Sequence, residues 1–365
     1  MRTTVAYINV NNLKHNLRAI RKLLPGVAVT AIVKANAYGH GITEIAGHLK
    51  DVVEFFGVAF VQEGMMLREA GITNPVVVLV PDTNDAVHYC DHNLQPAVSD
   101  LNFLRNLSAR AVEKNTIVKV HLYVDTGMKR DGITPVNAVS FMKEASKLKN
   151  IEFSGLLSHF ATSGSDIDFA RKQHSMFNYT VKELKDSGYN FEYTHMSNTR
   201  GILNLPEANF NMVRPGIALY GYPQDSAGAA EYGFKPVMQL KSTVISMRKV
   251  NSGETVGYDS FFRSDRDTNV ATIPIGYGDG YLKALQGKAE CLIRGKRYKI
   301  VGTICMDECM ADIGQDEISV GDEVVLIGSQ GNEKLLADEL AAKAGTIIYD
   351  VVTSIASRVP RIYVG

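Results

Sequence analysis

A lysine stands at the end of the first strongly apolar run of the chain, where its side chain is well placed for chemistry. Residues 27–33 read as a buried strand, Lys34 follows directly, and the polar turn of residues 35–41 comes next. In a parallel barrel or a doubly wound sheet, the groups that perform catalysis gather at the carboxyl ends of the strands. An amine held at such an end can form a Schiff base with a carbonyl compound. The alternative is an ordinary solvated lysine, because sheet rims also carry charges without a catalytic role.

Four other polar residues follow further apolar runs in the same way. Asp125, His159, Asn198 and Arg214 each stand at or just after the end of a different strand candidate. Closure of these strands into a barrel would gather the four side chains and Lys34 on one face, because the carboxyl ends of parallel strands meet there. We therefore predict a shared site at that face.

The elements that would position this site alternate between buried strands and amphipathic helices. Continuous Val, Ile and Leu runs separated by helical periodicity indicate a parallel sheet, and eight such runs favour a closed (β/α)8 TIM-type barrel within an α/β fold. The strand candidates are residues 27–34, 53–60, 75–80, 95–98, 117–124, 151–159, 192–196 and 210–214. The helix candidates are a segment that begins at Asn11 or Asn12 and stops at Pro25-Gly26, and residues 62–70, 101–113, 136–148 and 166–187.

The pattern changes after Tyr222. Residues 223–233 are rich in Gly, Ala and polar side chains and read as a linker, and a mostly β region follows, with one clear helical stretch at residues 335–342. Its strand candidates are residues 237–250, 270–275, 289–300, 323–327 and 355–364. We predict a barrel domain over residues 1–230 and a β domain over residues 231–365, which the N-terminal strand, residues 1–10, can join.

Composition favours a cytoplasmic protein that acts on a small molecule. Among the 365 residues, Lys and Arg together number 39 and Asp and Glu number 39, so charge gives no case for binding nucleic acid or an anionic membrane. The N-terminus lacks the pattern of a signal peptide, and no apolar stretch is long enough to span a bilayer. The 4 cysteines are too few for a disulfide framework, and the Cys305/Cys309 pair has no second pair beside it, so we expect buried thiols and no metal site.

The motifs around these residues resemble those of the bacterial alanine racemases, pyridoxal 5'-phosphate enzymes with an N-terminal barrel and a C-terminal β domain. The resemblance covers nearly the whole chain. It rests on residues 34–41, 125–130, 155–162, 195–199, 214–221, 256–259, 276–280, 302–307 and 349–361. It implies that Lys34 holds the cofactor and is one catalytic base. The second base would be Tyr258, which in the family enters the active site from the partner subunit of a head-to-tail homodimer.

The resemblance also implies the other cofactor contacts. His159 would lie beside the cofactor ring, and Arg214 would face its pyridine nitrogen. Because a guanidinium stays protonated, Arg214 should leave that nitrogen unprotonated, which weakens the electron sink and disfavours side reactions such as transamination. The remaining cofactor contacts would come from Tyr38, Asn198, Thr199, Gly216, Ile217 and Tyr349.

For the substrate, the resemblance implies Arg130 as the anchor of the carboxylate, the backbone of Met306 as a second contact, and Tyr277 on the entry path from the partner subunit. Three residues depart from the family pattern. Asp350 stands where a glutamate usually follows the tyrosine, a change of one methylene that we expect to matter little. Tyr123 stands where many members carry a carbamylated lysine, so Arg130 must be oriented by the phenol or by a bound anion. Thr303 stands where an arginine is common, and its shorter side chain leads to the hypothesis that serine or larger amino acids are also accepted.

The predicted function is therefore the interconversion of L-alanine and D-alanine, which in bacteria supplies cell-wall peptidoglycan. Three alternatives remain. One is a racemase of broader specificity for serine or basic amino acids. Another is a decarboxylase of the same fold, which would carry a glycine-rich run and a Glu-Pro-Gly-Arg stretch, whereas this chain has only Arg214-Pro215-Gly216. The last is a pyridoxal phosphate-binding protein without turnover, which would typically be a barrel alone.

Overall fold

The computed structural model describes residues 2–223 and 232–365, which form two compact units. The first, here called the barrel unit, comprises Asn16–Ala37 and Ile42–Leu219. The second, here called the strand unit, comprises Met1–His15, Tyr38–Gly41 and Tyr220–Gly365. Most of the predicted linker, residues 224–231, lies outside the described residues.

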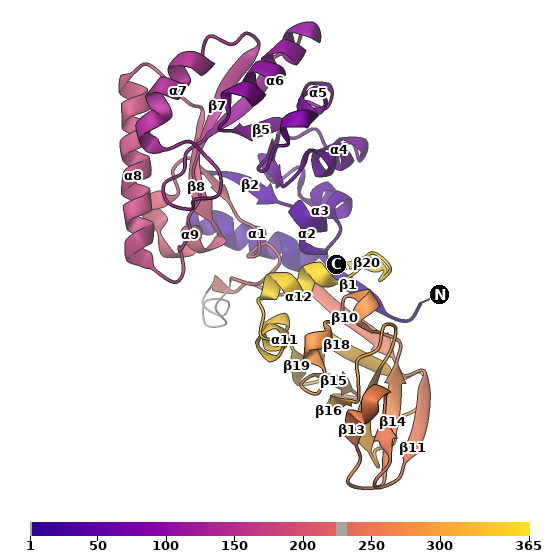
Figure 1. Ribbon diagram of the computed structural model, residues 1–365. Coiled ribbons are helices and arrows are strands. Elements are labelled where there is room, and N and C mark those ends of the chain that lie inside the picture. Colours follow the sequence, from indigo (N-terminus) through magenta and orange to yellow (C-terminus); the bar gives the residue numbers. More distant parts are fainter. Residues whose placement is uncertain (1, 224–231) are drawn as a thin grey trace. The chain divides into compact units, whose positions relative to one another are not determined.

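Eight parallel strands close into a barrel, as the sequence predicted (Figure 1). Each strand pairs with the next along the chain, and β2 pairs with β9 to complete the ring, with Val29 opposite Val213. Buried Val, Ile, Leu and Phe fill these strands because a barrel strand is covered by helices outside and by side chains inside. The strands are β2 (Ala28–Ile32), β3 (Phe55–Val58), β4 (Val76–Val78), β5 (Gln95–Val98), β6 (Val118–Tyr123), β7 (Ile151–Leu157), β8 (Tyr193–Asn198) and β9 (Met212–Arg214).

Helices connect successive barrel strands, and side-chain caps mark where several of them begin. Asp100, Asp166 and Asn198 each accept a hydrogen bond from a backbone N–H of the helix that follows. The helices up to the end of the barrel unit are α1 (Val10–Leu23), α2 (Lys34–Tyr38), α3 (Ile42–Leu49), α4 (Val61–Glu69), α5 (Ala86–Asp91), α6 (Leu101–Glu113), α7 (Ala138–Ala145), α8 (Ile167–Asp186) and α9 (Thr199–Asn204). Short 3₁₀ turns occupy Thr83–Asp85, Pro135–Asn137 and Pro206–Ala208.

The strand unit is built on one mostly antiparallel sheet. Strand β1 (Val5–Asn9) lies inside this sheet, antiparallel to β10 (Met238–Thr243) and parallel to β20 (Arg361–Val364). The other strands of the sheet are β11 (Ser246–Val250), β14 (Thr268–Ile273), β15 (Glu290–Ile293), β16 (Lys296–Val301), β17 (Cys309–Gly314), β18 (Glu323–Gln330) and β19 (Glu333–Leu335). A separate hairpin joins β12 (Thr255–Val256) to β13 (Phe262–Arg263), and 3₁₀ turns occupy Tyr258–Ser260, Tyr277–Asp279 and Lys283–Leu285.

The structure corrects several expectations for this unit. The run at 289–300 is a hairpin rather than one strand, because Arg294 and Gly295 both have positive φ, 50° and 75°, as a tight two-residue turn requires. The run at 237–250 likewise divides into β10 and β11, and of residues 355–364 only the last four form a strand. Besides α11 (Ala337–Ala344) there is a second helix, α12 (Ile348–Ser354), which was missed because its β-branched residues favour strands.

Two further expectations concerned the burial of the cysteines and the absence of a membrane-spanning segment. All four cysteines are free; Cys291 and Cys309 are buried as expected, whereas Cys90 and Cys305 are only half-buried, so that part of the expectation was wrong. In the part of the chain that the structure describes, no helix combines the length and the apolar character needed to cross a membrane.

Candidate active site

Lys34 lies two residues beyond the end of β2 and begins a turn of unusual handedness. Ala35, Asn36, Ala37 and Tyr38 all have positive φ, between 52° and 54°, so the segment labelled α2 is left-handed. A left-handed turn costs L-residues about 1–2 kcal/mol per residue. Strain of this kind persists only where the surrounding structure holds it, and it clusters at functional sites.

Two side chains of the barrel unit hold this turn. The carboxylate of Glu63, in the first turn of α4, accepts hydrogen bonds from the backbone N–H of Ala35 at 2.6 Å and of Ala59 at 2.7 Å. Asn36 Oδ1 accepts one from the backbone N–H of Ile42 at 2.9 Å. The strained backbone after Lys34 is thus fixed at both ends.

The surroundings of Lys34 favour a neutral amine. Burial lowers the pKa of Lys34 below its usual value, and the nearby charges of Arg130 and Arg214 lower it further, while the Glu63 carboxylate acts in the opposite direction. A neutral amine is both a nucleophile and a base, whereas an ammonium group is neither. The environment of Lys34 in the barrel unit therefore increases the fraction of neutral amine relative to a solvated lysine.

Arg214, the last residue of β9, is buried and is surrounded by neutral acceptors. Its guanidinium donates to His195 Nδ1 at 2.7 Å and to His159 Nδ1 at 3.1 Å. It also donates to the carbonyl oxygens of Ser158 at 2.7 Å and Met196 at 3.0 Å. Burial lowers the pKa of Arg214 to about 10, which still leaves it charged at neutral pH.

Because a guanidinium can only donate, this contact orders a chain of histidines. His195 Nδ1 must accept from Arg214, so its Nε2–H donates to His121 Nδ1 at 2.8 Å. His121 in turn donates from Nε2 to Gln95 Oε1 at 3.0 Å. Burial, followed by the charge of Arg214, lowers the pKa of His121 to about 3 and that of His195 well below its usual value, so both rings are neutral.

The loop after β6 carries Arg130 and is shaped by Asp125. Asp125 Oδ1 accepts hydrogen bonds from the backbone N–H of Gly127 at 2.9 Å and of Lys129 at 3.1 Å, which curls the loop back on itself. The exposed guanidinium of Arg130 donates to Asp131 at 3.1 Å and to the phenol oxygen of Tyr123. Burial raises the pKa of Tyr123, so its phenol is neutral.

Thr199 links the ends of β8 and β9. Its Oγ1 accepts hydrogen bonds from the backbone N–H of Gly216 at 3.1 Å and of Ala218 at 3.3 Å, which ties the turn after β9 to the start of α9. Asn198 Oδ1 caps the same helix by accepting from Gly201 N–H at 3.0 Å. Ile217 lies in this turn and is buried.

The predicted site residues of the barrel unit thus come from the ends of several different strands. Lys34, Arg130, His159 and Arg214 are close enough for their charges to affect one another, since the pKa of His159 is lowered by burial and then by the three cationic groups. Glu63, Gln95 and His121 belong to the same network, and sequence reasoning missed them. The signal for His121 was its position in β6, where a polar residue alternates with buried Val120 and Leu122.

In the strand unit, Tyr258 lies on a tight exposed turn after β12. Gly257, Asp259 and Ser260 have positive φ of 79°, 56° and 50°, and the side chain of Tyr258 is 69% exposed. The hydroxyl of Thr303 donates to the carbonyl oxygen of Tyr258 at 3.0 Å. Thr303 is itself only 7% exposed, so it supports the stem of this turn.

Three tyrosines of the strand unit cluster around the segment that follows the left-handed turn. The ring of Tyr38 lies 5.0 Å from that of Tyr220 and 5.7 Å from that of Tyr349, between centroids. Gly39 approaches α12 so closely that an added Cβ would lie 2.1 Å from the carbonyl oxygen of Val352. Two residues predicted to bind the same phosphate, Tyr38 and Tyr349, are therefore neighbours.

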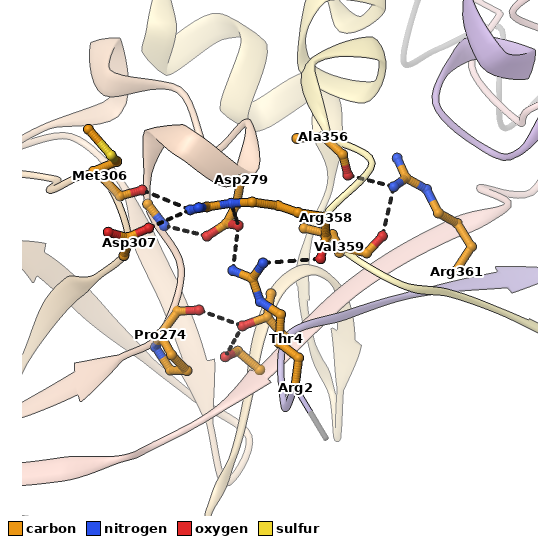
Figure 2. A network of polar contacts seen from close by, with 12 residues as sticks. Arg2, Thr4, Pro274, Asp279, Met306, Asp307, Ala356, Arg358, Val359 and Arg361 are labelled. Atoms are coloured by element: carbon orange, nitrogen blue, oxygen red, sulfur yellow. Dashed lines mark hydrogen bonds and ion pairs between the residues drawn. The ribbon is translucent and has the colours of Figure 1, made fainter.

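Tyr277 and Met306 lie on adjacent loops of the strand unit. The backbone N–H of Tyr277 donates to the carbonyl of Cys305 at 3.0 Å, and that of Gly278 donates to the carbonyl of Met306 at 2.9 Å. Figure 2 shows that Arg358 and Asp279 meet at these loops. The side chains of Tyr277 and Met306 are 42% and 53% exposed in the described chain.

Comparison with known proteins gives one consistent result. Residues 8–224 match the family described as alanine racemase, N-terminal domain, and residues 237–363 match alanine racemase, C-terminal domain. An alanine racemase of Clostridium novyi is 40% identical over 373 aligned residues, which cover 100% of this chain and 96% of that protein. One of Carboxydothermus hydrogenoformans is 38% identical over 371 residues, with 100% of both chains covered.

Solved structures agree. Alanine racemase from D-cycloserine-producing Streptomyces lavendulae superposes with a TM-score of 0.96 at 29% identity, covering 100% of this chain and 98% of that one. The enzyme from Bacillus anthracis with bound L-Ala-P gives a TM-score of 0.94 at 32% identity, covering 100% and 96% of the two chains.

Proposed function

Since this chain belongs to the alanine racemase family, we propose that it interconverts L-alanine and D-alanine with two bases, Lys34 and Tyr258, one on each side of the substrate α-carbon. The observation that carries the proposal is the cationic cluster around Lys34, in which partial burial and the charges of two arginines lower the pKa of the amine. Inversion of a stereocentre needs proton removal from one side and delivery on the other, and a single base reaches only one side.

The residues of the barrel unit fit pyridoxal phosphate. A neutral lysine amine suits bonding to an aldehyde, and a buried guanidinium with neutral partners suits a ring nitrogen that must stay unprotonated. When bound, this cofactor supplies an electron sink that acidifies the substrate α-proton. Lys34 would hold it covalently, Arg214 and His159 would flank its ring, and the phosphate would lie against Tyr38, Tyr349 and the turn after β9.

In this assignment the protein groups divide the work. Arg130, steadied by Tyr123 and Asp131, binds the substrate carboxylate as a planar fork. The backbone N–H of Met306 is the second contact to that carboxylate. Lys34 Nζ and Tyr258 Oη then each hold or release one proton at the α-carbon.

We further propose that Tyr258, Tyr277 and Met306 act in the active site of the partner subunit of a homodimer. Their side chains, together with Phe261 at 54%, are strongly exposed in a single chain, which supports a face that a second copy covers. Mixing Lys34→Ala with Tyr258→Phe chains tests this proposal. A mixed dimer would regain one intact site, so random exchange should restore about a quarter of the native activity from two inactive parents. No recovery after confirmed subunit exchange would refute shared sites.

Chiral analysis of alanine incubated with the pyridoxal phosphate-loaded protein tests the main proposal. We expect L-alanine and D-alanine to reach equal amounts, with α-proton exchange into heavy water and no release of carbon dioxide. Carbon dioxide release would favour a decarboxylase, and cofactor absorbance without exchange would favour a binding protein. A positive result would make the protein a source of D-alanine for peptidoglycan in a bacterial cell.

Thr303 supports a second candidate function, that of a racemase with a broader substrate range. Its side chain is short and turned toward the Tyr258 stem, whereas an arginine there would project further. Values of kcat/KM for L-alanine, L-serine and L-lysine decide this point. A preference for alanine of many thousand-fold would end the broader hypothesis and leave the alanine activity untouched.

A further inference from the structure

A fully buried carboxylate organises the loops that carry Tyr277 and Met306. Asp279 has no exposed side-chain surface, and its oxygens are bound by the guanidinium groups of Arg2 and Arg358 and by the backbone N–H of Gly276, at 3.0 Å for the last. A buried carboxylate is stable only when charges and hydrogen bonds satisfy it, as they do here. Figure 2 shows the two arginines converging on it from different segments.

Arg358 extends from this centre to the Met306 loop. Its Nε contacts Asp279 Oδ1 at 2.5 Å, while its Nη2 donates to the carbonyl oxygen of Met306 at 3.2 Å and to Asp307 Oδ1 at 2.7 Å. Arg2 binds the same carboxylate, but its other contact is the backbone carbonyl of Arg358 at 3.1 Å. Of the two arginines, only Arg358 therefore contacts the loop that carries Met306.

These contacts fix both peptide planes on either side of the Met306 α-carbon. The Cys305 carbonyl accepts a hydrogen bond from the backbone N–H of Tyr277. This carbonyl and the Met306 N–H belong to one trans peptide, in which the C=O and the N–H point in opposite directions. The Met306 N–H must therefore point away from the Tyr277 N–H. The following peptide is held by its own carbonyl, which accepts from Gly278 N–H and from Arg358. The direction of the Met306 N–H is thereby determined by the network rather than by the loop alone.

Two glycines allow the loops to approach this closely. A Cβ on Gly276 would lie 2.2 Å from the Cys305 carbonyl oxygen, and a Cβ on Gly278 would lie 2.7 Å from Arg358 Nη2. Real Cβ atoms do not tolerate such distances to backbone atoms, so the first position requires glycine. The glycine at 276 is therefore explained by this junction, whereas Gly280 has a positive φ of 88° and lies against the backbone of Ser354.

We propose that Arg358 is a positioning residue that, by bridging Asp279 to the Met306 carbonyl, aims the Met306 N–H at the substrate carboxylate. The inference rests on the proposed function, in which Met306 supplies that donor. Arg358 does not touch the substrate in this account. It acts on the following peptide, whose carbonyl it binds, and so on the backbone at the Met306 α-carbon.

The test compares Arg358→Gln with Arg2→Gln in the cofactor-loaded dimer. Both changes remove one guanidinium from Asp279, but only the first releases the Met306 carbonyl. For Arg358→Gln we expect KM for L-alanine to rise about tenfold, with kcat changed about twofold or less, because a misdirected donor weakens carboxylate binding. Arg2→Gln should lower thermal stability without moving KM.

Two further measurements distinguish a loss of positioning of the Met306 N–H from a loss of stability. Propionate carries the carboxylate without the amino group, so its inhibition constant should rise in Arg358→Gln by the same factor as KM and stay unchanged in Arg2→Gln. Arg358→Lys can pair with Asp279 but lacks the fork that also reaches the loop, so it should regain stability while KM stays high.

Several results would overturn the proposal. Equal KM values in Arg358→Gln and the native dimer, equal effects of the two glutamine variants, or restoration of KM by lysine would each remove the positioning role. If the native protein failed to racemise alanine at all, the proposed function would fail instead. Propionate binding would still report on the Met306 contact in that case.

Discussion

The two units hold their proposed catalytic groups in opposite ways. In the barrel unit, Arg214 lies in a buried network of side chains that bind one another, and half-buried Lys34 lies close enough for the charge of Arg214 to lower its pKa. In the strand unit, Tyr258 is 69% exposed on a tight turn, and the contacts that fix this turn are made through its backbone. The first arrangement tunes pKa values through burial and charge, whereas the second mainly sets direction.

This difference predicts which substitutions should affect both stability and activity and which should affect activity alone. Each member of the buried network is a partner of the next, so removing one leaves a buried polar group unsatisfied. An exposed phenol can lose its hydroxyl without such a cost. The barrel unit should therefore couple activity to stability, and the strand unit should separate them.

Lys34→Ala is the most severe test of the barrel side. The change removes the proposed covalent attachment and one of the two proposed bases, so we expect racemisation in both directions to fall by about 10⁴-fold or more. Chiral chromatography of alanine after long incubation measures this residual rate. A variant that retained a tenth of the native rate would show that the amine is not catalytic.

Tyr258→Phe should separate the two directions of the reaction. Loss of one general base costs about 10²–10⁴-fold in rate, and exchange of the α-proton into heavy water should fail for one enantiomer only, because Lys34 still serves its own side. Urea unfolding should be nearly unchanged, since the phenol is exposed. Equal loss of exchange for both enantiomers, or marked destabilisation, would erase the contrast between the units.

The sequence predicted the barrel well because each of its strands is short, buried on both faces and enclosed by helices. All eight strand candidates correspond to observed strands, and Lys34, Asp125, His159, Asn198 and Arg214 lie at or near their ends. Burial on both faces gives a continuous apolar run that single-sequence reading detects easily.

The strand unit was harder to predict because its determinants are non-local. Hairpin turns such as Arg294-Gly295 divide one apolar run into two strands, and β1 joins a sheet whose other strands lie more than 200 residues away along the chain. The histidine relay from Arg214 to Gln95 was missed for a similar reason. Its members lie on different strands, and only closure of the barrel brings them within hydrogen-bonding distance.

His121→Gln tests the buried network through stability and pH. The folded protein keeps His121 neutral with a pKa of about 3, whereas the unfolded chain has the ordinary value of about 6.5. The unfolded state therefore binds more protons below pH 6.5, so this contribution to stability is present above that pH and is lost as pH falls toward 3, with a slope of about 1.4 kcal/mol per pH unit.

In His121→Gln the slope of the unfolding free energy against pH should decrease by the contribution of one titrating group. At pH 7 the variant should be less stable by about 2 kcal/mol, because a glutamine amide does not fill the space of the ring that bridges His195 and Gln95 and leaves one of these two buried hydrogen bonds unmade. Urea unfolding at several pH values between 5 and 7 measures both effects. An unchanged slope would mean that His121 is not held neutral by the network.

The smallest expected effect is that of Tyr123→Phe, which asks how much the neutral phenol contributes to Arg130. Phenylalanine keeps the buried ring and loses only the hydroxyl that bonds the guanidinium, while Asp131 remains. We expect KM for L-alanine to rise about three- to tenfold with kcat nearly unchanged, the equivalent of one hydrogen bond of about 1 kcal/mol. Tyr298→Phe is the matched control, since it removes a phenol that donates to Asp316 at 2.7 Å in the strand unit. If both substitutions left KM unaltered, Arg130 would be oriented by Asp131 alone. The proposed substrate anchor of the barrel unit would then be fixed by as few side-chain contacts as Tyr258 is in the strand unit.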